Sequence, residues 1–491
     1  MLTRHNYLAK GGVLILTALF TVCGVHARRI PPHPDRLSYP PLSWEIPLGK
    51  PYRRTLANGL RAYIVPEHRF PVVRIVGYVR AGTLADPEGK EGVSSLTFQL
   101  MRTGGTEAFP ADTFDALCER LAISISSSCT QSHGYFKASF LSEYTDTAMF
   151  MLEQMLFHPV FAHNRVEQEK SITVEKIRHR FDDPGPTLSA AYYAAMYPGG
   201  ANSRLATEQG VKAISPHDLS AFHAAVMKTE NVILGVSGDF DTEKMIRRLE
   251  RMFPMAGNDT GVTFPTVAIR PYVKCLVVHK PISQAYVRMG LPLFKRPHPD
   301  YYPVTVLDQV LGGSSFISRL GTTVRSDEGL TYSIHSEAES NYTFAGTLYI
   351  SFFTRQETVN KAIAICRRES SKLVDAGITA EELASAKRIL IDALPSMFRS
   401  ADDIADVYSW NEYYGRSEDH FTAYPAKINA LTQNDIARVA RTYLVVDSLT
   451  YVVVGDTSKL FSQEAFDGFS LQNITPMNVI CPDDIESIGK E

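Results

Sequence analysis

The sequence repeats one pattern at a fixed distance along the chain. The segment ISPHDLSAFHAAVMKTENVILGVSGDF, which begins at Ile214, aligns without a gap with LTQNDIARVARTYLVVDSLTYVVVGDT, which begins 217 residues later at Leu431. Each copy opens with a Ser or Thr followed by an Asp in a helix-capping arrangement, continues as an amphipathic helix, and ends in an alternating strand before Gly-Asp. Two copies with cap, helix, strand and turn in one register predict a duplicated domain.

The duplication sets the expected domain boundaries. The stretch GNDTGVTFPTVAIRP, residues 257–271, is rich in turn-forming residues and separates the two copies. Each half mixes alternating segments such as VVRIVGYV with long amphipathic segments such as EELASAKRILIDALPSMF. We therefore predict an α+β fold with two homologous domains, each a mixed or antiparallel β-sheet with helices packed on one face. The expected parts are an N-terminal domain (44–256), a linker (257–273), a C-terminal domain (274–470) and a polar tail (471–491).

The N-terminus has the features of a secretion signal. Basic residues, Arg4 and Lys10 among them, precede the uncharged run GGVLILTALFTVCGV, and Val25-His26-Ala27 places small residues at the cleavage positions. We predict a signal peptide over residues 1–27 and an N-terminal extension over 28–43, with the mature chain exported to the periplasm or the extracellular space. An uncleaved anchor is the alternative, but the run is shorter than the roughly 20 apolar residues that span a bilayer. No later run is long enough, so we expect no stable membrane insertion after cleavage.

Charge and cysteine content exclude further classes. Fifty basic and 53 acidic side chains leave a formal net charge of -3, so no overall field attracts nucleic acid, and we expect no nucleic-acid partner. The cysteines after the signal are odd in number, widely scattered and free of any C-x-x-C pair. This distribution predicts buried free thiols rather than a disulfide framework. They are Cys118, Cys129, Cys275, Cys366 and Cys481.

Several segments occur in the order typical of one enzyme family. They are LANGLRAYIVPEH, RAGTLADPEGKEGVSSLTFQLMRTGGT, LEQMLFHPVF and VEQEKSITVEKIRHRFDDP. This order resembles the N-terminal half of the pitrilysin/insulinase family of zinc metallopeptidases (inverzincins), and the resemblance continues through the second half. It implies that the two domains form half of a clam-like chamber. It also implies that the family's H-x-x-E-H motif belongs on a helix over residues 94–103, which Gly104 and Gly105 close.

The residues at the motif positions cannot perform zinc chemistry. In the family, two histidines four residues apart bind zinc, the glutamate beside the second is the general base, and a second helix supplies a third ligand. The resemblance places Ser95 and Gln99 at the histidine positions, Phe98 at the base position and Lys176 at the third ligand position. A hydroxyl and a carboxamide are poor zinc ligands, a phenyl ring accepts no proton, and an ammonium group repels a cation. We therefore predict a degenerate site without metal or other cofactor in this chain.

The helix itself has a second purpose in this interpretation. Val93, Leu96 and Leu100, together with Phe98, would form an apolar face that holds the first domain together. An active metalloendopeptidase with an unrecognised metal site is an alternative. Its candidate ligands are not paired at metal spacing on one helix face: His158, His163, His179 and His223.

The second half keeps residues that the resemblance makes functional. In LGGSSFISRLGTTVRSDEGLTYSIHS, residues 311–336, we expect Gly329 to end a helix with Arg325 in its last turn, and a strand from Leu330 to carry Tyr332. In active relatives, an arginine and a tyrosine at this spacing face the zinc across the chamber, bind the substrate and stabilise the oxyanion. From the pattern alone, the two residues could equally be a solvated helix-end charge and a half-buried strand tyrosine.

The loss in the first half and the retention in the second imply a division of labour between subunits. The resemblance implies a non-catalytic subunit of an exported heterodimeric zinc metallopeptidase, supplying Arg325 and Tyr332 in trans for peptide hydrolysis. The zinc would then be bound by a sister subunit of the same family. A non-enzymatic scaffold or peptide-binding protein of the same fold is the alternative function.

Overall fold

The computed structural model describes residues 33, 37, 44–258 and 262–489. The predicted signal peptide, residues 1–27, lies outside the described residues, as does most of the predicted extension 28–43. Ile46–Glu491 forms one compact unit. Among the described helices, none combines the length and the apolar character needed to cross a bilayer.

The first half is built on a six-stranded mixed sheet with the strand order β1-β2-β6-β3-β5-β4. Its only parallel pair is β2 with β6, and its other neighbours are antiparallel. The strands are β1 (Arg53–Thr55), β2 (Arg61–Pro66), β3 (Val72–Val79), β4 (Ser124–Cys129), β5 (Gly134–Leu141) and β6 (Val232–Gly238). The helices are α2 (Val93–Thr103), α3 (Ala111–Arg120), α4 (Thr145–Phe157), α5 (His163–Arg178), α6 (Pro184–Met196), α7 (Glu208–Ala213), α8 (Pro216–Val226) and α9 (Thr242–Met252).

The second half repeats this plan with the strand order β12-β7-β11-β8-β10-β9. Its strands are β7 (Cys275–His279), β8 (Gln284–Pro292), β9 (Ile334–Glu339), β10 (Thr347–Arg355), β11 (Thr450–Gly455) and β12 (Met477–Ile480). Its helices are α10 (Tyr301–Leu311), α11 (Val359–Ala376), α12 (Ala380–Asp392), α13 (Ala401–Tyr413), α14 (His420–Asn429), α15 (Gln433–Tyr443) and α16 (Thr457–Leu460). The predicted α+β class with two homologous sheet-and-helix domains is confirmed.

The repeated caps explain why the two halves share a register. In α8, Ser215 and Asp218 bond reciprocally to each other's backbone N–H groups, and Thr432 and Asp435 do the same in α15. Each cap satisfies backbone donors that would otherwise lack partners in the first helical turn. The strands that follow, β6 and β11, take the same position in their sheets.

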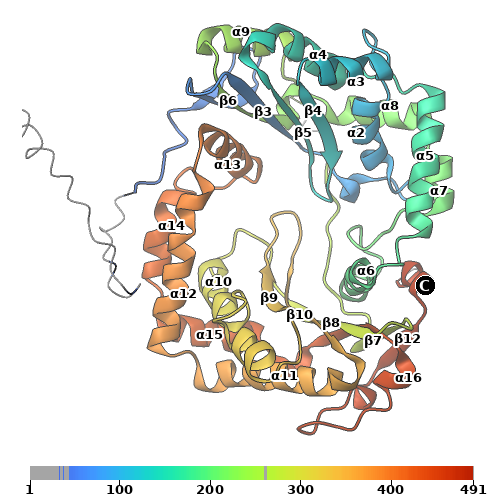
Figure 1. Ribbon diagram of the computed structural model, residues 1–491, viewed down its shortest axis with the longest axis vertical. Coiled ribbons are helices and arrows are strands. Elements are labelled where there is room, and N and C mark those ends of the chain that lie inside the picture. Colours follow the sequence, from blue (N-terminus) through green and yellow to red (C-terminus); the bar gives the residue numbers. More distant parts are fainter. Residues whose placement is uncertain (1–32, 34–36, 38–43, 259–261, 490–491) are drawn as a thin grey trace, which may run out of the picture. The chain divides into compact units, whose positions relative to one another are not determined.

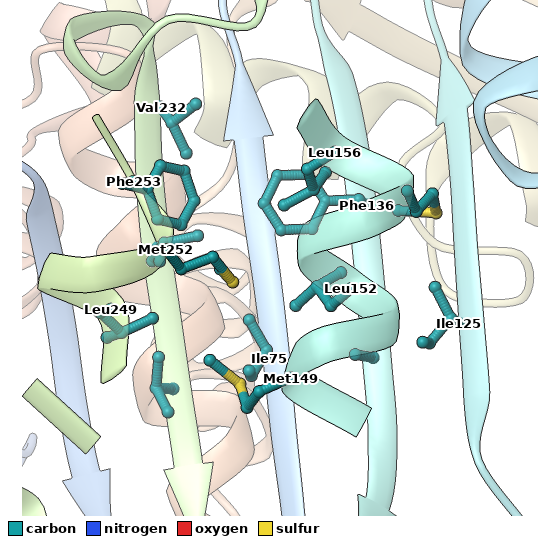
Figure 2. Close-up of a cluster of buried hydrophobic side chains, with 14 of the residues drawn as sticks. Ile75, Ile125, Phe136, Met149, Leu152, Leu156, Val232, Leu249, Met252 and Phe253 are labelled. Carbon is teal, nitrogen blue, oxygen red and sulfur yellow. The ribbon is translucent and has the colours of Figure 1, made fainter. Parts of the chain in front are cut away.

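One face of the first sheet forms the core of the N-terminal half. Met149 and Leu152 of α4 and Leu249 of α9 point toward the strands, where they meet Ile75 and Phe136 (Figure 2). Burying a side chain of this size stabilises the fold by roughly 1.5–3 kcal/mol. This cluster fixes α4 and α9 on the sheet.

The opposite face of each sheet is covered by a helix from the other half. Helix α13 of the second half packs on β2, β3 and β6, and helix α6 of the first half packs on β7, β8 and β11 (Figure 1). The Tyr78 hydroxyl of β3 donates to the Asp406 carboxylate of α13. On the second sheet, a methyl group added at Gly290 would fall 1.9 Å from the Tyr192 hydroxyl oxygen of α6. Neither sheet is therefore covered by its own half alone.

The chain after residue 470 is part of the second sheet. We expected residues 471–491 to be a polar tail, but β12 within them pairs in parallel with β7 from Cys275 to Val278. The described residues between Phe253 and Cys275 contain no helix or strand, as a linker would. The five cysteines among the described residues are free; Cys481 is exposed, contrary to the expectation of burial, because it precedes a short surface 3-10 helix.

Candidate functional site

Helix α2 starts and ends where the sequence predicts. Gly92 takes a left-handed conformation with φ 107°, and the buried Asp86 carboxylate accepts hydrogen bonds from the backbone N–H groups of Gly92 (2.7 Å) and Ser94 (3.0 Å). Burial raises the pKa of Asp86 to about 6, although the two hydrogen bonds oppose that shift. Gly104 closes the helix by donating its N–H to the Leu100 carbonyl. The frame of the helix is therefore intact.

Helix α2 buries its apolar side chains in two clusters. Leu96 and Leu100 pack in a buried cluster with Val174 of α5, and Val93 belongs to the same cluster. Phe98 is completely buried (0% exposed) in the main core, where a methyl group at Gly134 would lie 2.0 Å from the tip of its ring. The expectation that these four side chains hold the domain together is confirmed.

Ser95 and Gln99 are the exposed members of the former motif. They lie four residues apart and therefore share one face of α2. The Thr103 hydroxyl donates to Glu169 of α5 over 3.3 Å, which fixes how the two helices lie against each other. Lys176, two turns beyond Glu169, is exposed on α5. The structure therefore places positions 95, 99 and 176 on the surfaces of two adjoining helices and turns position 98 away from them.

This set of side chains does not fit zinc. Zinc sites use thiolate, imidazole and carboxylate donors, and the exposed groups here are a hydroxyl, a carboxamide and an ammonium. The general base position is no better, because the Phe98 ring faces the core. No catalytic step can be derived through a metal held by these residues.

The alternative metal ligands are dispersed. His223 points its Nε2 at the Leu156 carbonyl over 2.9 Å, and burial lowers its pKa. His179 lies between Asp182 (2.8 Å) and Glu175 (3.3 Å) as an exposed ion-pair group, and those carboxylates raise its pKa. Within the described ranges, no cluster of three or more His, Cys, Asp or Glu side chains is arranged to hold a metal ion. The remaining candidates lie at the end of α4 and at the start of α5: His158 and His163.

Arg325 and Tyr332 come together on the surface of the second half. The Arg325 guanidinium lies over two rings, 4.1 Å from the centroid of Phe316 and 5.0 Å from that of Tyr332. Both rings are exposed, Tyr332 at 78% and Phe316 at 65%. In the part of the chain that the structure describes, no carboxylate pairs with Arg325. Cation–π stacking uses the face of a guanidinium, so its N–H edge remains available to an acceptor.

The backbone around this pair differs from the sequence expectation. Gly329 ends the helix in a left-handed conformation (φ 58°), as predicted, but residues 321–327 form a π-helix rather than an α-helix. The strand begins at Ile334, so Tyr332 lies in the connection and not in a strand. The reason is local, because the Thr331 hydroxyl accepts from the Ser333 N–H (3.1 Å) and donates to the Ser333 carbonyl (2.9 Å). Such side-chain bonds compete with strand pairing.

Arg319 anchors the segment that carries the pair. Its guanidinium makes a two-pronged contact with Glu382 at the start of α12 (2.7 and 2.9 Å) and donates to the Gly377 carbonyl (2.9 Å). Bidentate arginine–carboxylate pairs fix orientation as well as distance. The segment that carries Arg325 is therefore attached to the start of α12 through Arg319.

The two groups of predicted site residues remain separate. Among the described residues, no hydrogen bond, ion pair or ring contact joins Arg325 or Tyr332 to Ser95, Gln99 or Lys176. Sequence reasoning missed Phe316, the second ring that the Arg325 guanidinium lies over. Its available signal was an aromatic residue within the small-residue run Gly-Gly-Ser-Ser-Phe.

Family models match most of the folded chain. A model described as Insulinase (Peptidase family M16) matches residues 65–207, and one described as Peptidase M16 inactive domain matches residues 213–390. The boundary between the two matches lies just before the repeated helix α8.

Individual proteins show the same likeness. The chain is 23% identical to the "Non-peptidase homolog YmxG" of Helicobacter pylori over 80% of this chain and 91% of that protein. It is 27% identical to the "Uncharacterized zinc protease YmxG" of Bacillus subtilis over 68% and 81% of the two chains. The crystal structure of a peptidase M16 inactive domain from Pseudomonas fluorescens superposes with a TM-score of 0.74 at 20% identity, covering 82% of this chain and 97% of that one.

Proposed function

Because this chain belongs to the peptidase M16 family but has no zinc ligand or base at positions 95, 98, 99 and 176, we propose that it is the non-catalytic subunit of an exported, heterodimeric zinc metallopeptidase. Its sister subunit would bind the zinc and its activated water. This chain would supply Arg325 and Tyr332 to the sister's chamber. The export step rests on the N-terminal sequence pattern.

One observation carries this proposal. The Arg325 guanidinium contacts two exposed aromatic rings and has no acidic partner in the described structure. Ile317, beside Phe316, is 63% exposed as well, so apolar side chains gather around the cation. Exposed apolar clusters on soluble proteins mark contact surfaces. The cluster supports an interaction in which a partner or a substrate covers Arg325.

The chemistry of the pair suits a developing negative charge. The guanidinium offers a fork of N–H donors, and the Tyr332 hydroxyl offers one O–H donor on the same surface. Donors aimed at the oxygen of a tetrahedral intermediate stabilise the transition state more than the ground state. In this proposal, Arg325 and Tyr332 bind the substrate carbonyl oxygen and Phe316 keeps the guanidinium in place.

The peptide itself would bind through its backbone. Strand β4 is an edge of the first sheet and lies beside α2, so part of its backbone has no neighbouring strand. An extended peptide can add to such an edge with little dependence on sequence. The Arg102 Nε–H donates to one β4 carbonyl, that of Ile125, over 2.8 Å. This hydrogen bond limits where an added strand can pair.

The test uses the complex with a zinc-bearing M16 subunit from the same source. Arg325→Ala and Tyr332→Phe are each co-purified with that subunit, and kcat is measured on a peptide substrate. Loss of one oxyanion donor typically lowers kcat by about 10²–10³. The matched control is Arg388→Ala, an exposed arginine on α12 outside the segment 311–336. Full activity in both test variants, with intact assembly, would refute the contribution in trans.

A second candidate is a non-enzymatic peptide-binding or scaffold protein of the same fold. It is favoured by the relative described as a non-peptidase homolog. In that case, the purified chain binds peptides at β4 without a zinc-bearing partner. Peptide binding that is unaffected by Arg325→Ala, together with no co-purifying M16 subunit, would select this candidate.

A further inference from the structure

A cavity lies in the C-terminal half, beside the start of α10. It encloses about 520 Å³ and is formed by the residues before α10, the turn after α13, and α14. Its lining holds three cationic side chains, Arg296, Arg416 and Lys427, and no Asp or Glu side chain. The first-half site residues and the pair Arg325–Tyr332 do not line it. The positive charge of this cavity is therefore not explained by the sites described above.

The three cations contact aromatic rings rather than carboxylates. The Arg296 guanidinium lies 3.6 Å from the ring centroid of Tyr301 and 4.4 Å from that of Tyr342. The Arg416 guanidinium lies 4.9 Å from the ring centroid of Tyr342, and the Lys427 ammonium lies 5.1 Å from that of Tyr302. None of these three cations forms an ion pair within the described structure. Aromatic rings attract the cations, but they do not neutralise the positive charge and they leave N–H groups available to an acceptor.

Burial of Arg296 and of part of Arg416 makes the absence of acidic partners costly, whereas Lys427 is exposed. Arg296 is only 9% exposed, and desolvation lowers its pKa. The Nε of Arg416 is buried without a hydrogen-bond partner. Asp419 acts electrostatically on His420 and Lys427, but it is exposed and does not line the cavity. Buried charges are ordinarily paired, but the described residues provide no counter-charge for this cluster. A bound anion would supply it.

The cavity is also preorganised. The backbone N–H of Arg416 donates to the Asn411 carbonyl (3.0 Å), and the Asn411 side chain donates to the Ser417 carbonyl (3.2 Å), which fixes the turn after α13. The backbone N–H of Arg296 donates to the Asn341 carbonyl (2.8 Å). Rigid donors reduce the entropy lost when a ligand binds.

We propose that this cavity is a binding site for a multiply charged oxyanion, held by Arg296, Arg416 and Lys427. The guanidinium edges donate paired hydrogen bonds to the anion oxygens, and the lysine adds a point charge. Phosphate and carboxylate oxygens share this chemistry. The site is separate from the proposed catalytic contribution and does not depend on it.

The test measures binding of inorganic pyrophosphate and of citrate to the full chain by calorimetry, at constant ionic strength adjusted with NaCl. Arg416→Gln and Lys427→Gln each remove one cationic side chain from the lining of the cavity. The matched controls, Arg388→Gln and Lys459→Gln, remove the same charge from exposed positions outside the cavity. A charged hydrogen bond corresponds to about tenfold in affinity, so we expect each test variant to weaken binding at least tenfold. We expect both controls to bind as the wild type does.

Each outcome has a defined meaning. Binding of pyrophosphate alone assigns the site to phosphate groups, binding of citrate alone assigns it to carboxylates, and binding of both supports the general oxyanion site. Absence of millimolar binding for both anions overturns the proposal. Equal affinity in the test and control variants also overturns it, because binding would then lie elsewhere. Circular dichroism of each variant without anion shows whether it is folded.

Discussion

Replacing Phe98 tests whether α2 is kept for packing rather than for chemistry. Phe98 is fully buried in the main core, whereas Ser95 and Gln99 are exposed on the same helix. We expect Phe98→Ala to destabilise the protein strongly and Ser95→Ala and Gln99→Ala to have almost no effect. The comparison keeps the helix and the new side chain constant and changes the burial and the size of the side chain that is removed.

The magnitude follows from burial and size. Removing a fully buried phenyl ring costs about 3–5 kcal/mol, because the cavity adds to the lost transfer free energy. An entropy of unfolding near 2.1 cal/mol/K per residue gives about 0.9 kcal/mol/K for a unit of the length of Ile46–Glu491. A loss of about 4 kcal/mol then lowers Tm by about 4 °C if the unit unfolds together. If the N-terminal half unfolds separately, the smaller entropy doubles the shift to about 9 °C.

The assay is differential scanning calorimetry at one scan rate, supported by urea unfolding. The exposed substitutions should stay within about 0.5 kcal/mol of the wild type, which is about 1 °C or less in Tm. A cost for Phe98→Ala below about 1.5 kcal/mol would refute the reasoning. So would a cost for Ser95→Ala or Gln99→Ala equal to that of Phe98→Ala.

Two further predictions concern charge and the contact between the halves. Because burial raises the folded pKa of Asp86 to about 6, above its ordinary value near 3.8, the native state takes up a proton that the unfolded state does not, and stability should rise as pH falls from 7 through 6. Asp86→Asn should remove this gain, and equal pH slopes in urea unfolding of the variant and the wild type between pH 7 and 5 would contradict it. Tyr78→Phe and Asp406→Ala should couple by about 1.5 kcal/mol in a double-mutant cycle, because their hydrogen bond joins a strand of one half to a helix of the other. Additive costs would show that this bond does not hold α13 on the first sheet.

Local signals allowed much of the fold to be predicted. The caps Ser215–Asp218 and Thr432–Asp435 are short-range patterns, so the helices that they begin could be located from sequence. Alternating runs such as residues 72–79 became strands at the expected positions, because the alternation and the apolar content of these runs are short-range signals. The apolar face of α2 was predictable for the same reason.

Contacts between distant residues could not be predicted in this way. No local pattern indicates that α13 covers the first sheet, because that choice depends on partners such as Tyr78, 328 residues away from Asp406. The strand predicted from Leu330 failed because the Thr331 side chain bonds to the Ser333 backbone, an alternative that alternation does not reveal. The polar composition of residues 471–491 hid β12, because an edge strand needs only one apolar face.

The positions of the degenerate motif predict which part of a zinc site can be restored. Positions 95 and 99 share an exposed face of α2, and position 176 is exposed on the adjoining helix, so Ser95→His, Gln99→His and Lys176→Glu together should yield a folded chain that binds zinc. Adding Phe98→Glu replaces a buried ring with a buried carboxylate and should unfold the N-terminal half, because an unpaired charge in the core is costly. Metal content of the purified triple variant, compared with the wild type, measures the first effect, and calorimetry measures the second. A folded triple variant without zinc would show that the three positions do not converge; a stable quadruple variant would show that the Phe98 ring does not hold α2 to the sheet.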